Sequence, residues 1–280
     1  MTHLLARCAM VLQNKRIAII GVGNMGLALM RGMLDSEVVA PSMITVHNRR
    51  PERTQSLVEQ YGVTGADSNA ACVADADIVL IAVKPQIFDK VLPEIRDHLG
   101  QALLISVAAG ITCSRIEAAL GDQTRVVRAM PNTPATIKEG AAGLCAGSFA
   151  TEADVDLATA ILEQICQVVV VDEVHMDAVT GLSGSGPAYL MLIIEAFSDA
   201  GVRVGLSREV AQALAVQTIR GSARLLQETQ EHPGRLRDQV TSPGGTAIAG
   251  LHALEEGGLR TTIMNAVEAA TKRAKELGDS

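Results

Sequence analysis

The sequence predicts an α/β doubly wound domain followed by an all-helical domain. Between residue 15 and about residue 171, short apolar runs alternate with amphipathic helical stretches such as 53–61 and 88–99. Near-continuous apolar runs are typical of parallel strands that helices cover on both faces. The expected strands lie at residues 17–20, 43–46, 78–81, 103–107, 125–128 and 167–171.

The character of the chain changes after Asp172. Strand-like runs stop, and helices separated by Gly and Pro loops are expected at residues 187–204, 207–229, 246–256 and 259–277. The first of these helices carries Tyr-Leu-Met-Leu-Ile-Ile with almost no polar face, so it needs burial on all sides. A few further helices cannot supply that burial, which predicts a dimer interface. The expected domains are a loose N-terminal extension at 1–15, the α/β domain at 16–172 and the helical domain at 173–280.

The composition is that of a globular protein and argues against two classes of partner. Hydrophobic residues make up 48% of the 280 residues, and the net charge is -7 with no Trp and only five other aromatic side chains, two Tyr and three Phe. That balance neither neutralises phosphates nor stacks bases, which excludes a nucleic-acid binder. No apolar run approaches the roughly 18 residues of a membrane span, and Arg7 splits the short apolar stretch that could resemble a signal peptide. The five scattered cysteines indicate reduced thiols in a cytoplasmic protein.

A glycine-rich turn follows the first expected strand and opens a helix that runs to about Leu34. The first glycine permits a tight turn, the second lets the backbone approach a pyrophosphate, and the third lets the helix pack against the strand. The strand before the turn and the helix after it distinguish this motif from an ordinary glycine cluster. We therefore expect a Rossmann-type dinucleotide-binding domain with the pyrophosphate at the helix N-terminus. The residues of the turn are Gly21, Val22, Gly23, Asn24, Met25 and Gly26.

The end of the second expected strand bears on which dinucleotide is bound. NAD sites commonly place an acid there for the ribose hydroxyls, whereas this chain has His47, Asn48, Arg49 and Arg50. Two guanidiniums can clamp a 2′-phosphate, which a carboxylate would repel. The alternative is a solvated basic start to the helix at Pro51. The pattern favours NADP(H) and does not exclude NAD(H).

Further cofactor contacts are expected where other parallel strands end, because ligands bind at the carboxyl ends of such strands. Asn69, at the start of a helix, is either a further cofactor contact or an N-cap. Residues 130–134, with the sequence Met-Pro-Asn-Thr-Pro, follow one more strand. The remaining candidates follow two neighbouring strands and are Ala82, Val83, Lys84 and Pro85 after one, and Ala108, Ala109 and Gly110 after the next.

With these residues in view, the chain resembles pyrroline-5-carboxylate reductases from residue 16 onward. Residues 21–26, 83–86 and 128–134 carry the first part of the resemblance. Gly-Leu-Ser-Gly-Ser-Gly-Pro-Ala-Tyr at 181–189 and Thr-Ser-Pro-Gly-Gly at 241–245 are specific to the family. The resemblance implies hydride transfer from NAD(P)H to the C=N carbon of 1-pyrroline-5-carboxylate, giving L-proline. It also implies an all-α dimerisation domain, an active site between the dinucleotide domain of one subunit and the helical domain of the other, and a homodimer that can assemble further.

The resemblance also assigns substrate and cofactor contacts in the second half of the chain. Glu173 corresponds to an acid near the substrate, although a surface carboxylate is a fair alternative, and Gln239 stands where relatives often have an Asn that contacts the cofactor. Two glycines at a helix N-terminus expose backbone N–H groups to an anion, whereas a plain loop is the alternative from the residues alone. The residues expected to hold the substrate carboxylate are Pro243, Gly244, Gly245, Thr246 and Ala247.

One of these positions departs from the family pattern. Relatives normally have Thr where this chain has Ala247, so either Thr246 and the neighbouring backbone suffice or the activity is reduced. A catalytically silent NADP(H)-binding regulatory protein therefore stays open as an alternative. A β-hydroxyacid dehydrogenase is the other rival, but it needs a catalytic Lys where Leu190 stands.

The scattered histidines predict neither a Ser-His-Asp triad nor a metal cage. A protonated cyclic imine accepts hydride directly, so the protein has to bind the substrate, align it with the nicotinamide and exclude water. A proton donor is needed only if the substrate binds neutral. Ser183 and Thr246 are the catalytic candidates, with Ser185 or water as alternatives.

Overall fold

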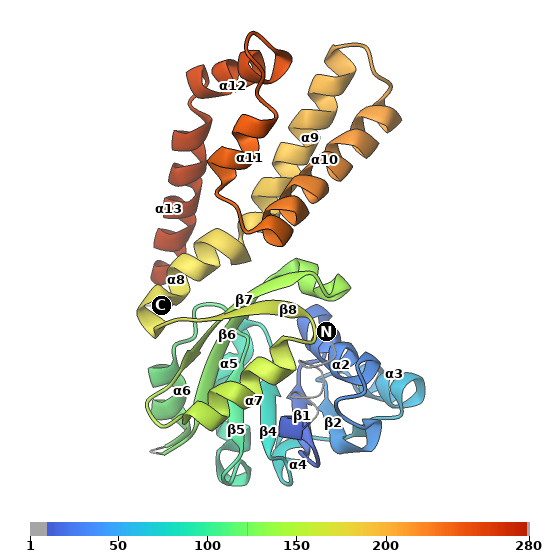
Figure 1. Ribbon diagram of the computed structural model, residues 1–280. Coiled ribbons are helices and arrows are strands. Elements are labelled where there is room, and N and C mark those ends of the chain that lie inside the picture. Colours follow the sequence, from blue (N-terminus) through green and yellow to red (C-terminus); the bar gives the residue numbers. More distant parts are fainter. Residues whose placement is uncertain (1–9, 122, 279–280) are drawn as a thin grey trace. The chain divides into compact units, whose positions relative to one another are not determined.

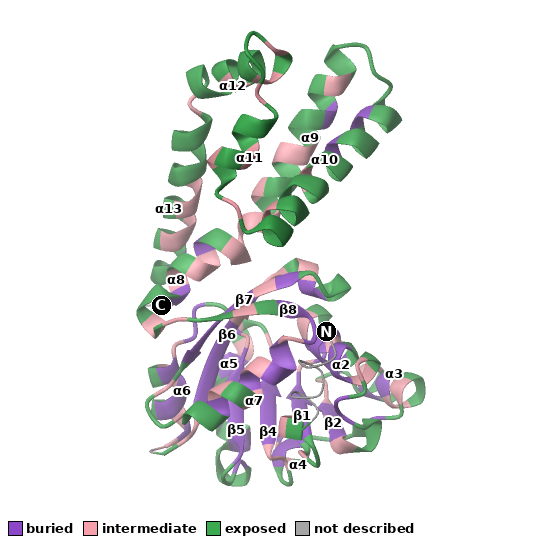
Figure 2. Ribbon diagram, in the orientation of Figure 1, coloured by how far each residue is buried: buried purple, intermediate pink, exposed green. Residues whose placement is uncertain are grey.

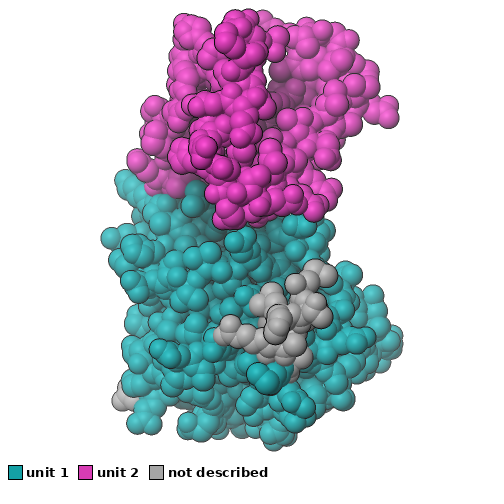
Figure 3. Space-filling model, viewed as in Figure 1, with its two compact units in different colours: residues 1–185, 269–280 teal, residues 186–268 magenta. Residues whose placement is uncertain are grey.

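A computed structural model describes residues 10–121 and 123–278 (Figure 1). The chain forms two compact units, residues 1–185 with 269–280 and residues 186–268 (Figure 3). The segment that follows the sheet, 173–185, belongs to the first unit, whereas the predicted boundary at residue 172 was placed before it. Residues 1–9 of the expected N-terminal extension lie outside the described residues. Leu12, in the part that is described, is 1% exposed, so that part is packed and not loose.

The first unit is built on an eight-stranded sheet in the order β3-β2-β1-β4-β5-β6-β7-β8. Every described neighbouring pair is parallel except β6 and β7, which are antiparallel. The chain leaves β1 toward β2 and β3 and then returns to the other side of β1 as β4, which makes a topological switch point beside β1. The strands are β1 Ile17–Ile20, β2 Ile44–His47, β3 Thr64–Gly65, β4 Ile78–Ile81, β5 Leu103–Ser106, β6 Val126–Pro131, β7 Gly140–Ala146 and β8 Cys166–Val170.

The apolar pattern of β1 shows why this sheet is buried on both faces. Ile17 and Ile19 belong to one apolar cluster, and Ala18 and Ile20 belong to a second. Successive side chains of a strand point to opposite faces, so each face of the sheet has its own core. Figure 2 shows this burial along the strands and on the inner sides of the helices that cover them.

The helices of the first unit supply the other half of these two cores. The longer helices are α2 Asn24–Asp35, α3 Pro51–Tyr61, α4 Asn69–Val73, α5 Pro85–Ile95, α6 Cys113–Leu120 and α7 Glu152–Leu162. Shorter 3-10 segments are η1 Pro41–Met43, η2 Arg96–His98, η3 Thr133–Ile137 and η4 Glu173–His175. The short helix α8 Met176–Val179 leads into a π-helical turn, η5 Thr180–Gly184.

The second unit is all-helical, as the sequence predicts. Its helices are α9 Gly186–Arg203, α10 Arg208–Thr229, α11 Pro233–Gln239 and α12 Thr246–Glu256, and α13 Leu259–Gly278 begins in it. Within residues 186–268 the buried side chains are Ser198, Ala211 and Ala215, while Met191 and Leu192 on α9 are 64% and 67% exposed. The largely exposed second unit is visible in Figure 2.

The predicted α/β domain followed by a helical domain is thus confirmed. Two strands, β3 and β7, were not expected from the sequence, and β7 introduces an antiparallel pair into an otherwise parallel sheet. None of the helices in the described part of the chain combines the length and hydropathy that crossing a bilayer requires.

Candidate functional site

A cleft of about 1050 Å³ lies beyond the carboxyl ends of β1, β2 and β4. The register pairs Ile20 of β1 with His47 of β2 and with Ile81 of β4, so the residues that follow these strands meet at one edge. A cleft at the switch point of a parallel sheet is the usual place for a nucleotide. The predicted cofactor residues that line it are Gly21, Val22, Gly23, Asn24, Asn48, Arg49, Arg50, Asn69, Ala82, Val83 and Lys84.

The three glycines of the turn differ in what surrounds them. Gly21 has φ +87°, and a Cβ placed on it would lie 2.6 Å from Val83 Cγ1. A Cβ on Gly26 would lie 2.6 Å from the carbonyl oxygen of Gly21 and 3.2 Å from Ala82 Cβ, whereas a Cβ on Gly23 would meet nothing within 4 Å. Gly21 and Gly26 therefore allow the turn and the helix to pack, and Gly23 leaves open space at the N-terminus of α2.

Asn48 ties the glycine turn to the end of β2. Its Oδ1 accepts a hydrogen bond from Val22 N at 2.9 Å, and its backbone N–H donates to Thr54 Oγ1 at 3.1 Å. This leaves Asn48 Nδ2 buried, and no described residue is a hydrogen-bond partner for it. Because buried polar groups are almost always hydrogen-bonded, this donor points to a ligand in the cleft.

Asn69 presents the complementary group on another wall of the cleft. Its Nδ2 donates to Glu94 Oε2 at 2.7 Å, and its Oδ1 is buried without a partner among the described residues. A carboxylate can only accept, so Glu94 fixes the amide with its oxygen available as an acceptor. The N-cap of α4 is Ser68, whose side chain accepts from Ala71 N, so the alternative reading of Asn69 as the N-cap is wrong.

The charges along the cleft are mostly basic near the end of β2. Arg49 and Arg50 are exposed, and half-buried Arg53, in the first turn of α3, joins them in the cleft wall. Arg53 is not among the residues predicted from the sequence, although it stands three residues after Arg50, a spacing that brings two side chains together on a helix. Lys84 and Lys90 also line the cleft, together with the acids Asp67 and Glu94.

Some predicted cofactor residues do not line the cleft. Met25 and Gly26 lie inside α2, and Pro85 is the first residue of α5. Ala108, Ala109 and Gly110 form the loop after β5, where the backbone N–H of Ala108 donates to Ser106 Oγ at 3.3 Å and Gly110 has φ +75°. A Cβ on Gly110 would lie 3.5 Å from the backbone of Gly278 at the end of α13, so this loop is packed. Ala109 is exposed within it.

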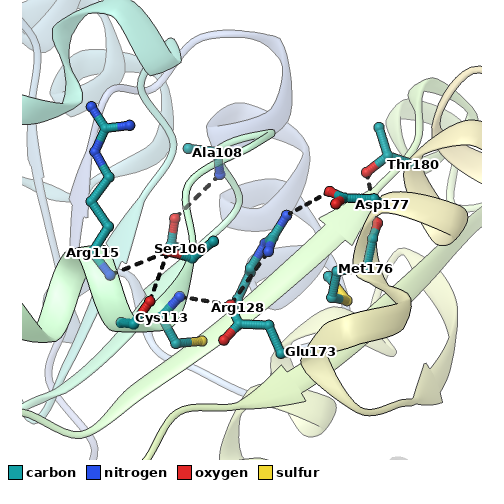
Figure 4. Close-up of polar contacts among 11 residues, drawn as sticks. Ser106, Ala108, Cys113, Arg115, Arg128, Glu173, Met176, Asp177 and Thr180 are labelled. Carbon is teal, nitrogen blue, oxygen red and sulfur yellow. Dashed lines mark hydrogen bonds and ion pairs between the residues drawn. The ribbon is translucent and has the colours of Figure 1, made fainter. Parts of the chain in front are cut away.

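Glu173 lies in the first unit, where β8 leads into η4 (Figure 4). Its Oε1 accepts from the backbone N–H of Cys113 at 2.7 Å and lies 3.3 Å from an Arg128 guanidinium nitrogen. Arg128 is 3% exposed and also lies 3.8 Å from Asp177 Oδ1. Glu173 therefore has two firm partners within the first unit, and its contact with substrate stays a prediction.

Cys113 and Cys145 lie beside this carboxylate, and both thiols are buried. Their sulfur atoms lie within 4.8 Å of each other. The interaction between the two thiols, with burial adding to it, raises the pKa of Cys113, and the same interaction lowers the pKa of Cys145. Cys72 and Cys166 differ, because burial raises the pKa of each to about 12, at Cys72 against a smaller lowering by a hydrogen bond to the Ile19 backbone.

The catalytic candidate Ser183 lies in the π-helical turn of the first unit. Its hydroxyl donates to the carbonyl of Val179 at 3.0 Å, and its own carbonyl accepts from Asn132 Nδ2 at 3.0 Å. Asn132 Oδ1 accepts from Ala141 N at 2.9 Å, so this side chain joins the turn to β7. The hydroxyl proton of Ser183 is thus already engaged.

The other substrate candidates belong to the second unit. Gly244 has φ +67° in the loop before α12, and Gly245 is the N-cap of α12 without a side-chain cap. The first backbone N–H groups of α12 are therefore available to an anion. Gln239 is the exposed last residue of α11. The full predicted loop is Pro243, Gly244, Gly245, Thr246 and Ala247, of which Thr246 is exposed and Ala247 is half-buried.

Two family models match the chain. One, described as pyrroline-5-carboxylate reductase dimerisation, matches residues 173–277, and the other, described as NADP oxidoreductase coenzyme F420-dependent, matches residues 16–110. Both halves of the predicted organisation are thus represented.

Known pyrroline-5-carboxylate reductases match almost the whole chain. The protein of that name from Methanosarcina acetivorans is 44% identical over 95% of this chain and 99% of its own length. The one from Escherichia coli is 39% identical over 95% of this chain and 100% of its own.

Solved structures give the same result. The Coxiella burnetii pyrroline-5-carboxylate reductase superposes with a TM-score of 0.92 at 38% identity, covering 96% of this chain and 100% of its own. The Plasmodium falciparum pyrroline carboxylate reductase with NADP bound has a TM-score of 0.85 at 33% identity, covering 95% and 99%. The resemblance that the motifs predicted is confirmed: the chain belongs to the pyrroline-5-carboxylate reductase family.

Proposed function

We propose that this protein reduces the C=N bond of 1-pyrroline-5-carboxylate to L-proline with NAD(P)H, the final step of proline biosynthesis. The observation that carries the proposal is the family match, at 44% identity over 95% of the chain, together with a nucleotide cleft at the switch point of the sheet. The match includes both the sheet-based unit and the helical unit.

The cleft residues fit a dinucleotide. Gly23 leaves open space at the N-terminus of α2, where N–H groups and the helix dipole favour a pyrophosphate. Asn48 offers a buried donor and Asn69 a buried acceptor, which suit a phosphate or ribose oxygen and a ribose hydroxyl respectively. When bound, the nicotinamide supplies the hydride, and these residues set its position.

We propose a preference for NADP(H) over NAD(H). Arg49, Arg50 and Arg53 lie along the cleft next to the end of β2, and no acid stands in the His47–Arg50 segment. Guanidiniums bind phosphate bidentately, so three of them close together favour the 2′-phosphate of NADPH.

The substrate carboxylate is proposed to bind at the Pro243 to Ala247 loop. Exposed N–H groups at the start of α12 can hold it, since Gly245 leaves them without a side-chain cap. Between the two proton-donor candidates the geometry favours Thr246. Ser183 already donates its hydroxyl proton to Val179, whereas Thr246 is exposed at the first position of α12.

We further propose that the protein works as a homodimer or as a larger assembly of such dimers. Exposed apolar side chains on α9, among them Met191 and Leu192, support a partner surface. The match of residues 173–277 to a dimerisation model supports the same assignment. Sedimentation across a range of protein concentrations should show no monomer at assay concentrations.

The decisive experiment follows NADPH oxidation with synthetic pyrroline-5-carboxylate, with a reaction lacking the imine as the blank. Turnover with formation of L-proline supports the reductase. Tight NADPH binding without turnover at millimolar imine would instead support the silent regulatory protein that Ala247 leaves open.

A further inference from the structure

Two thiols and a carboxylate converge where three segments distant in the sequence meet. Cys113 begins α6, Cys145 lies on β7, and Glu173 begins η4. The two sulfurs and a carboxylate oxygen all lie within 4.8 Å of one another, and among the described residues they form the group that could hold a metal ion. Figure 4 shows Cys113 and Glu173 facing each other beside Arg128.

We propose that Cys113, Cys145 and Glu173 bind one thiophilic divalent cation, with zinc as the natural occupant. Thiolate sulfur and carboxylate oxygen are both ligands of zinc in proteins. Three protein ligands leave one position of a tetrahedral site for water, and the partly exposed Glu173 side chain, at 32% exposure, gives that water and the cation a route in.

The charges around the group allow a cation despite the neighbouring arginine. Arg128 is buried and contributes one positive charge, while Glu173 and Asp177 each contribute one negative charge. A divalent cation that displaces the protons of two thiols adds two positive and two negative charges. The net charge of the buried cluster is therefore the same with the metal as without it, and in both states Arg128 offsets one of the two negative charges of Glu173 and Asp177.

The geometry also brings the sulfurs together before any metal arrives. The sulfurs of Cys113 and Cys145 already lie within 4.8 Å of each other, and the backbone N–H of Cys113 donates to Glu173 Oε1 at 2.7 Å. The three ligand atoms are already held within 4.8 Å of one another by residues of α6, β7 and η4, so side-chain shifts can close the site. A bound cation would tie α6, β7 and η4 together and stabilise the first unit.

The test uses the full chain carrying Cys8→Ser, stripped with chelator and kept reduced with a phosphine, with Cd²⁺ as the probe. The ultraviolet band of thiolate-bound cadmium should saturate at one Cd²⁺ per chain, and the thermal midpoint should rise. Cys113→Ser and Cys145→Ser should each weaken the affinity by more than about tenfold. The matched controls Cys72→Ser and Cys166→Ser remove buried thiols outside the group and should keep the band.

Three results would each refute the proposed site. The first is no ultraviolet band up to millimolar Cd²⁺, the second is a stoichiometry other than one Cd²⁺ per chain, and the third is a full band in the Cys113→Ser, Cys145→Ser double variant. Circular dichroism establishes whether the serine variants fold. If they do not, Glu173→Gln keeps both thiols and should show the band at weaker affinity, and unchanged affinity in that variant refutes the three-ligand site.

Discussion

Two alanine substitutions in the glycine turn test its two expected roles separately. Gly23→Ala tests the approach of the cofactor, and Gly26→Ala tests the packing of α2. Gly23 has an extended backbone with φ -80°, which alanine adopts freely, and its Cβ would enter open space. Gly26 lies inside α2, where its Cβ would come within 2.6 Å of the Gly21 carbonyl oxygen. The two substitutions add the same atom to the same motif and should fail in different ways.

The expected magnitudes follow from these surroundings. Gly23→Ala should change the free energy of unfolding by less than about 0.5 kcal/mol. Its methyl group should weaken NADPH binding by roughly 10- to 160-fold, since a lost N–H to phosphate bond costs about 1.5–3 kcal/mol. Gly26→Ala gains about 1 kcal/mol of helix propensity but overpacks a site where overpacking costs about 1–3 kcal/mol. Because the contact is with a backbone oxygen at 2.6 Å, the cost should fall in the upper part of that range, and the variant should lose about 1–2 kcal/mol of stability.

Two measurements on each variant distinguish a loss of cofactor binding from a loss of stability. Isothermal titration gives the NADPH Kd, and denaturant unfolding without nucleotide gives the stability. Gly23→Ala with wild-type NADPH affinity would refute the assignment of the pyrophosphate to the N-terminus of α2. Gly26→Ala with wild-type stability would show that α2 shifts freely against the turn, contrary to the close packing with Gly21 and Ala82.

The remaining predictions concern the cofactor phosphate and the substrate loop. Arg49→Ala with Arg50→Ala should weaken NADPH binding by roughly 30- to 160-fold, from about 1–1.5 kcal/mol for each exposed guanidinium, and NADH binding by less than about threefold. The control Arg31→Ala with Arg96→Ala removes the same charge from exposed positions outside the cleft and should leave both affinities unchanged, whereas equal losses for both nucleotides would disprove the clamp. Ala247→Thr should raise kcat/KM for the imine by roughly 2- to 12-fold, the value of one hydrogen bond, without changing the KM for NADPH. Steady-state kinetics showing no gain would mean that the hydroxyl is not missed.

The strands that could be predicted are those whose burial requires a continuous apolar run in the sequence. β1, β4 and β5 are buried on both faces, so their apolar runs stand out: β1 and β4 have the predicted bounds, and β5 ends one residue earlier than predicted. β3 consists of two exposed residues and therefore has no apolar run that would indicate a strand. β7 has the sequence Gly-Ala-Ala-Gly-Leu-Cys-Ala, whose strand propensity is low. It is a strand through its pairing with β6 and β8, and Gly143 lets Val179 pack closely against it; no local pattern contains these tertiary contacts.

The position of the cleft could be predicted from the sequence, but the orientation of the side chains that line it could not. Strand ends and glycines located the walls, because the topology of a parallel sheet dictates where those ends meet. Which atom of Asn69 faces the ligand depends on Glu94, which is distant in sequence and approaches only in the folded chain. The thiol group of Cys113 and Cys145 likewise has no spacing motif, since one residue begins a helix and the other lies on a strand.

The helical unit buries few of its side chains, and this affects how its stability depends on protein concentration. Residues 186–268 bury Ser198, Ala211 and Ala215, while side chains as large as Phe197 on α9 stay 49% exposed. Burial of apolar area at about 25 cal/mol per Å² is what offsets the entropy of ordering a chain. We propose that a unit with so few buried side chains obtains that burial from a second copy, in keeping with its match to a dimerisation model. Its stability should therefore rise with protein concentration, so variants in this unit have to be compared at one fixed concentration.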